Sequence, residues 1–208
     1  MILESNNNLN LQNNLEIIVE IISILKRFTG LEDLTITLVE SKLFSYMLDL
    51  VENYNMILLK HFLEFLIHLI ESTRLKKKKN NCFFREKEKK NMLFEQIGQL
   101  FFLGKMLMIF ESHDIGFKLT ILNIISKIIK HPLVNENFQK MKGFSVFFNE
   151  MKKVNNQKVK ILTLHCFNEL IQNPTNFFYF KAHGIVNYLE GNLRFFFSLH
   201  YLIINFFL

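Results

Sequence analysis

The chain has 208 residues, of which 50% are hydrophobic, with only seven Gly and two Pro. This length allows one domain with a substantial core, and the apolar content excludes disorder along most of the chain. The scarcity of Gly and Pro argues against a fold of strands and tight turns, which needs many turn residues. We do not interpret the abundance of Asn and Phe, including 24 Phe, as evidence of function.

The N-terminal residues 1–14 (MILESNNNLNLQNN) are rich in Asn and are expected to be disordered. They lack the basic start and the long apolar stretch of a signal peptide. The two cysteines, Cys82 and Cys166, form neither a disulfide framework nor a zinc-binding pattern. We therefore expect a cytoplasmic protein.

Segments with the apolar spacing of a buried helix begin near residues 17, 58, 117 and 159. In the third, Leu119, Leu122, Ile125, Ile128 and Ile129 are three, four or one residue apart, so one helical face is apolar. The starts are separated by 41, 59 and 42 residues, and the middle separation exceeds the last by 17. An insertion of that length in a repeated unit explains the difference.

The basic residues of the chain are concentrated in one segment that has this length. Residues 74–90 (RLKKKKNNCFFREKEKK) contain nine basic and two acidic residues, a net charge of +7, whereas the whole chain carries +6. We expect an exposed insert loop between helices. The alternative is a patch that binds nucleic acid, an anionic membrane or an acidic partner through Lys76, Lys77, Lys78 and Lys79.

A second pattern follows the third and fourth of these helices. The stretches NENFQKMKGF (135–144) and NFFYFKAHGI (176–185) each place a Gly eight residues after an Asn, with aromatic residues between. This pattern predicts a short second helix in each unit. Gly143 and Gly184 are expected to permit the sharp bend into the next helix.

Proline marks the end of the longer helices. Pro132 and Pro174 are 42 residues apart and stop the preceding helix, because proline lacks an N–H and clashes with the preceding turn. The Asn residues of the two stretches are 41 apart, so the second unit is expected to be one residue shorter after its proline. Helical units of about 40 to 47 residues are typical of armadillo and HEAT solenoids. We predict an all-α solenoid of about four units over residues 15–190, with Phe filling the core.

The stretch NPTNFFYFKAHGIVNYLE (173–190) resembles the armadillo repeat family. The matching positions are Asn176, Phe180, Gly184, Ile185 and Leu189. The resemblance implies a right-handed solenoid that binds proteins along its concave face. More weakly, the pattern is similar to the armadillo-like region of BEACH-domain proteins and to the kinase-binding armadillo-like subunit of the septation-initiation pathway.

In armadillo proteins the concave face is lined by one helix of each unit, with an Asn near its end and a Trp one turn earlier. The alignment of the units assigns polar residues to both positions, which departs from importin-style binding of basic peptides. The resulting candidate groove residues are Arg27, His68, Lys127 and Glu169 at the Asn-like position, and Ser23, Glu64, Asn123 and His165 at the Trp-like position. Arg27 and Lys127 favour a partner segment that is acidic or phosphorylated.

Motifs of catalysis are absent from the sequence: it has no Gly-rich phosphate loop, no Gly-x-Ser-x-Gly and no His-Glu-x-x-His. Cys166 aligns with the apolar Ile124 and is expected in the core, whereas Cys82 is expected to be an exposed thiol. We therefore expect a non-catalytic scaffold without cofactor or metal, and a protein partner.

Residues 191–208 are highly apolar and fit no repeat. Their apolar part (FFFSLHYLIINFFL) is shorter than the roughly 20 residues that a membrane span needs. We expect a packed terminal helix, with a tail anchor or a truncated end as alternatives.

Overall fold

The computed structural model describes residues 2–29, 37, 56–72, 83–112 and 114–191. Every regular element in these residues is a helix. The all-α class predicted from the apolar spacing and the repeated units is therefore confirmed.

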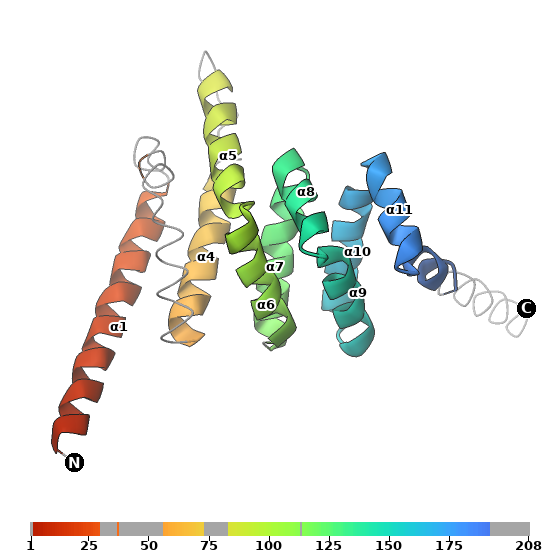
Figure 1. Ribbon diagram of the computed structural model, residues 1–208. Coiled ribbons are helices and arrows are strands. Elements are labelled where there is room, and N and C mark those ends of the chain that lie inside the picture. Colours follow the sequence, from red (N-terminus) through yellow and green to blue (C-terminus); the bar gives the residue numbers. More distant parts are fainter. Residues whose placement is uncertain (1, 30–36, 38–55, 73–82, 113, 192–208) are drawn as a thin grey trace, which may run out of the picture.

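Four long helices of the described chain pack side by side in their order in the sequence. Helix α1 (Ile2–Phe28) packs against α4 (Met56–Ser72), α4 against α7 (Ile115–Ile128), and α7 against α10 (Gln157–Ile171). Figure 1 shows this row crossing the molecule from left to right. The segments that the sequence places at equivalent positions therefore form one layer, which we call the long-helix row.

The remaining helices form a second layer on one side of this row. In Figure 1 they lie in front, and α7 and α10 are drawn fainter behind them. Contacts between α6 and α7, and between α9 and α10, join the two layers. The second layer contains α5 (Phe83–Ile97), α6 (Leu100–Ser112), α8 (Pro132–Lys140), α9 (Gly143–Lys153) and α11 (Pro174–Ala182), and residues 185–191 are also helical.

The N-terminal segment differs from its prediction. Residues 1–14 were expected to be disordered, but α1 begins at Ile2. Neither Pro nor Gly occurs before Gly30, so nothing in the sequence stops the helix from extending backward from its apolar part. Among the residues of α1 whose side chains are described, Leu15 is the first that packs against the core.

The structure of residues 74–90 also differs in part from the predicted insert loop. Residues 83–90 form the first half of α5, and residues 73–82, including Lys76–Lys79, lie outside the described residues. Glu86 precedes Lys90 by four residues, a spacing that favours helix despite the high charge. The predicted terminal helix likewise lies outside the described residues from position 192 onward.

The turn between the second and third helices corrects the alignment of the units. Helices α8 and α11 both begin at proline and both have nine residues, so the spacing of 42 persists through the turn. Lys142, rather than Gly143, is therefore the counterpart of Gly184. Both adopt the left-handed conformation, with φ of 55° and 68°.

Gly143 is needed for close packing instead of for the bend. A Cβ atom at this position would lie 2.5 Å from Cε2 of Phe138. Phe138 is fully buried and aligns with Phe180, which is 1% exposed, at the spacing of 42. The aromatic side chain of the short helix therefore packs under the turn in both units.

Aromatic rings connect the helices of these two units. The Phe138 ring lies 5.0 Å from that of Phe147 and 5.5 Å from that of Phe144, in edge-to-face geometry. Phe144 contacts Phe180 at 5.1 Å, and Phe180 contacts Phe167 of α10 at 5.2 Å. Most of the Phe side chains that the structure describes are thus buried in the core as predicted, although some, such as Phe178 at 74% exposure, are not.

Buried amide side chains join the short helices α8 and α11. The Asn176 amide nitrogen donates to the carbonyl oxygen of Leu170 at 2.7 Å and to Oδ1 of Asn135 at 3.2 Å. Gln139 donates to both Asn135 and Asn176. The Leu170 carbonyl lies in the last turn of α10 and also accepts the backbone N–H of Asn173 at 3.1 Å. Asn176 is thus a second donor at the end of α10.

A buried ion pair holds α6, α7 and α9 together. The Lys118 ammonium donates to Oε2 of Glu150 at 2.9 Å and to the carbonyl oxygens of Phe110 and Glu111, in the last turn of α6. The two charged residues are only 5% and 4% exposed. Lys153 donates to the other Glu150 oxygen at 2.9 Å. This pair could not be identified from the sequence, because its members are 32 residues apart.

The surroundings of Glu150 act on its pKa in opposite directions. Burial raises it, but hydrogen bonds from Lys118 and Lys153 outweigh burial and hold the pKa below its ordinary value of 4.5. Because the folded-state pKa is below the unfolded-state pKa, Glu150 stabilises the fold above about pH 4.5, and this contribution is lost as the pH falls through the folded-state pKa.

Replacing Asn176 by Leu should lower the free energy of unfolding by about 1–3 kcal/mol, because the Leu170 carbonyl and the Asn135 amide lose a buried partner. Urea denaturation followed by circular dichroism measures this. Asn187→Ala, at an exposed position, is the control and should change stability by no more than about 0.5 kcal/mol. Equal stability of the two variants would show that the amide cluster contributes nothing.

Replacing Glu150 by Gln should lower stability at neutral pH by roughly 3 kcal/mol, because Lys118 stays buried without its counter-ion. The wild-type chain should lose stability between pH 5 and pH 3, and the variant should lose less. Urea midpoints over this pH range give both results. Glu136→Gln removes an exposed pair with Lys140 and should have little effect at any pH. An acid dependence that is the same in wild type and Glu150→Gln would refute this role.

Candidate functional site

The eight candidate groove residues lie on the four helices of the long-helix row. Each helix carries two of them, one turn apart, and none belongs to the buried core. The polar residues that interrupt these helices therefore lie at or near the surface. They are Ser23 and Arg27 on α1, Glu64 and His68 on α4, Asn123 and Lys127 on α7, and His165 and Glu169 on α10.

Several of these residues form ion pairs between neighbouring helices. Lys26 of α1 pairs with Glu64 of α4 at 3.5 Å, and Lys130, in the turn that follows α7, pairs with Glu169 of α10 at 2.6 Å. Lys127 of α7 pairs with Glu71 of α4. One ion pair thus bridges each neighbouring pair of helices in the row.

These ion pairs show that two of the candidate residues already interact with other residues of the chain. Lys127 was expected to attract an acidic partner, but Glu71 already supplies a carboxylate to it. Glu169 is held by Lys130 and lies 4.0 Å from the His165 ring. Lys127 and Glu169 therefore join helices of the row to one another.

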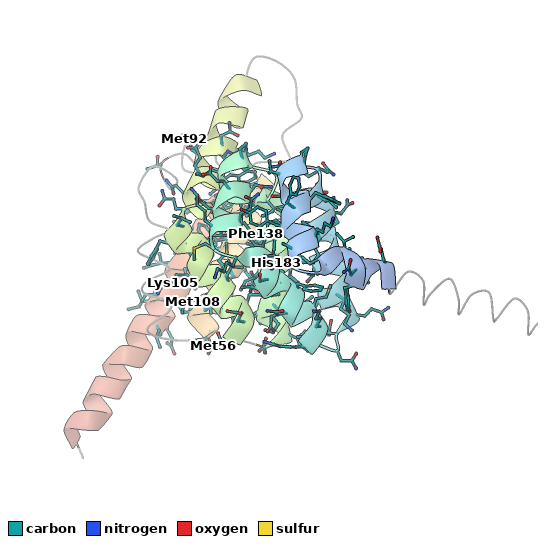
Figure 2. The ribbon with its side chains drawn as sticks, turned by 45° about the vertical axis from the view of Figure 1, so that its right-hand side comes forward. Met56, Met92, Lys105, Met108, Phe138 and His183 are labelled. Atoms are coloured by element: carbon teal, nitrogen blue, oxygen red, sulfur yellow. The ribbon has the colours of Figure 1, made fainter. Side chains whose placement is uncertain are left out.

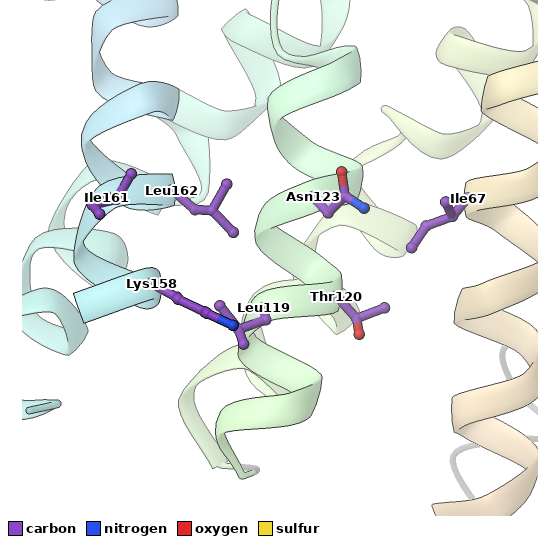
Figure 3. A pocket seen from close by; sticks show the side chains of 7 residues that line it. All are labelled: Ile67, Leu119, Thr120, Asn123, Lys158, Ile161 and Leu162. Atoms are coloured by element: carbon purple, nitrogen blue, oxygen red, sulfur yellow. The ribbon is translucent and has the colours of Figure 1, made fainter. Parts of the chain in front are cut away.

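A solvent-accessible groove of about 470 Å³ lies between α4, α7 and α10. In Figure 3, Lys158 and Leu162 extend from α10 towards α7, and Ile67 extends from α4 towards Asn123. Of the eight candidates only Asn123 lines this groove. The lining residues are Ile67, Leu119, Thr120, Asn123, Lys158, Ile161 and Leu162.

The groove combines apolar walls with two polar side chains. Ile161 is 58% exposed, although it belongs to a helix whose other face is buried. Asn123 offers an amide, and Lys158 offers an ammonium group that has no ion pair within the described residues. Such a surface can hold an apolar side chain together with a carboxylate or a backbone amide.

One signal in the sequence could have identified this groove. Leu119 and Ile161 correspond at the spacing of 42, as do Thr120 and Leu162. In α10 the buried positions include Val159, Cys166 and Leu170, and Ile161 lies outside that face. Leu119 packs partly against the core, but Ile161 at the equivalent position is exposed, and an exposed aliphatic residue beside other apolar side chains can mark a binding surface.

Catalytic and metal-binding groups do not converge in the described part of the chain. No cluster of three or more His, Cys, Asp or Glu there could hold a metal ion. The Cys166 thiol is completely buried and lies 3.8 Å from the Leu122 carbonyl oxygen. Burial, with a smaller contribution from the negative charge of Glu169, raises its pKa to about 12.

No single helix in the described residues is both long and apolar enough to cross a bilayer. Residues 90–97 together with Leu100–Ser112 reach the required length and composition only as a pair bent by 62°.

Cys166 should not react with a thiol reagent in the native protein, because about one thiol in ten thousand is ionised at pH 8 and the sulfur is inaccessible. A Cys82→Ser chain, in which Cys166 is the sole cysteine, allows a spectrophotometric test. Labelling should begin only when urea unfolds the chain. Adding Leu164→Cys, on the exposed side of α10, should produce rapid labelling of one thiol per chain. Rapid native labelling without that change would contradict the buried position of Cys166.

Comparisons with protein-family models, with curated proteins and with solved structures find no match to this chain.

Proposed function

We propose that this chain is a non-catalytic scaffold that binds a segment of another protein along an armadillo-like solenoid. The observation that carries the proposal is the groove between α4, α7 and α10, which is open, largely apolar and formed by equivalent helices of successive units. Binding surfaces of solenoid proteins arise in this way, because stacked units present equivalent side chains next to one another.

The repeated order of the helices supports the solenoid. A long helix, a short helix that begins at proline and a third helix follow one another in α7–α8–α9, and again in α10–α11 and residues 185–191. The first two helices of the second unit begin 42 residues after their counterparts. The long helices pack on one another, so each unit extends the same row.

The chemistry of the groove defines the partner segment. Ile67, Leu119 and Ile161 favour an aliphatic or aromatic side chain. Lys158 favours an acidic or phosphorylated residue close to that side chain, since a charge-assisted hydrogen bond to an ammonium group is strong. Asn123 can bond to the backbone of an extended segment, as an amide side chain both donates and accepts.

A library of random peptides displayed on phage and selected on the purified chain tests this proposal. The selected peptides should share an apolar residue close to an acidic one. Ile161→Asp and Lys158→Glu should each weaken binding by at least about tenfold, or 1.4 kcal/mol. Fluorescence anisotropy of one synthetic peptide gives these affinities.

Met108→Asp is the matched control, because Met108 is as exposed as Ile161 but lies on α6. It should leave peptide affinity unchanged. Selected peptides without a shared pattern, or with affinities that do not respond to Ile161→Asp and Lys158→Glu, would refute the groove as the binding site. A chain that instead binds nucleic acid, with an affinity that falls steeply with salt, would support the basic segment 74–90 as the functional surface.

A further inference from the structure

Helix α1 has a second apolar face, which is exposed to solvent. One side, with Leu15, Ile18, Val19, Ile22 and Leu25, packs against the core. A different set of large apolar residues is exposed to solvent: Ile17 (57%), Ile21 (49%), Ile24 (40%) and Phe28 (42%).

The spacing of these four residues is that of a helix–helix seam. They are separated by four, three and four residues, so they form one stripe within an arc of about 60° on the helix. A repeat of alternating three and four residues is the pattern of the contact positions in coiled coils. In Figure 1, α1 is the first helix of the row, and it packs against α4. The stripe thus has the pattern of a surface that packs against another helix.

Charged residues line one edge of this stripe. Glu20 and Arg27 each immediately precede a stripe residue, Ile21 and Phe28, and they lie on the same side of the helix. They are seven residues apart, or about 10 Å along the axis, so they cannot pair with each other within one helix. Neither forms an ion pair within the described residues. The edge is acidic in its N-terminal half and basic in its C-terminal half.

We propose that this face binds α1 of a second copy of the chain, in antiparallel orientation about a two-fold axis. Such an axis near Ile22 and Ser23 places Ile21 of each copy against Ile24 of the other, and Ile17 against Phe28. In antiparallel helix pairs the same edges face each other, so Glu20 of each copy meets Arg27 of the other. The surface is self-complementary, as a two-fold interface must be.

A parallel pair does not satisfy these groups. In that orientation opposite edges of the stripe meet, and Glu20 faces the position of Leu25 rather than Arg27. The charges stay unpaired along a seam that is otherwise apolar. The distribution of charge along α1 therefore selects the antiparallel pair.

Sedimentation velocity of the full chain over a range of concentrations tests the proposal. The wild-type chain should reach a mass twice its monomer mass of 24.9 kDa. Ile21→Glu combined with Ile24→Glu should weaken dimerisation by at least about a hundredfold, because four carboxylates then meet at the axis. Met108→Glu, which places a carboxylate at an exposed position of α6, should leave the dimer unchanged.

Charge exchange tests the orientation and does not depend on core packing. Glu20→Arg alone and Arg27→Glu alone should each weaken the dimer, because each places like charges together across the seam. The double variant Glu20→Arg/Arg27→Glu should restore it. Circular dichroism confirms that the helical content of each variant is unchanged. A wild-type chain that is monomeric at all concentrations, or a dimer insensitive to the paired Glu substitutions, overturns the proposal. Failure of the double variant to restore the dimer overturns the antiparallel orientation.

Discussion

The central constraint in this structure is the burial of α7 between its neighbours. Ile121, Leu122, Ile124, Ile125 and Ile128 are all fully buried, which an isolated amphipathic helix cannot achieve, and they are covered by α4, α6 and α10 together. A unit without neighbours would expose this surface, so its stability comes from stacking. Only the remaining strip of α7, with Thr120, Asn123 and Lys127, reaches the outside, and the groove and one of the ion pairs form along this strip.

The helices of the row could be predicted because their apolar periodicity is long and uninterrupted. The short helices could be predicted from proline, which starts α8 and α11 as much as it ends the helices before them. The turns could not be placed correctly. Aligning Gly143 with Gly184 assumed that both glycines serve the bend, whereas Lys142 takes the left-handed conformation in one unit and Gly143 makes room for Phe138. Gly184 is needed for its left-handed backbone and Gly143 for its lack of a side chain, and the sequence alone does not distinguish these two reasons.

The candidate site was less predictable than the fold, since its groups are brought together from distant parts of the chain. The sequence places Asn123 and Lys127 on the outside of α7 but does not show that Glu71, 56 residues earlier, reaches Lys127. Likewise, the Asn residues of the short helices looked like part of a family motif. Asn135 and Asn176 instead bond to each other and to the end of α10 inside the molecule. Some polar residues on these helices therefore face solvent, whereas others form buried hydrogen bonds between helices. The periodicity of the sequence alone does not distinguish the two kinds.

The two proposed surfaces lie at different places on the same row, which has a consequence for binding. Arg27 belongs to α1 at the edge of the row, whereas Lys158 and Ile161 belong to α10, with α4 and α7 between them. Pairing through α1 would leave the groove of each copy open and would relate the two grooves by the two-fold axis. A partner with two copies of the recognised segment could then occupy both grooves at once. Its second binding event would be intramolecular, so overall affinity would rise with the match between linker length and groove separation, without any new contact in either groove.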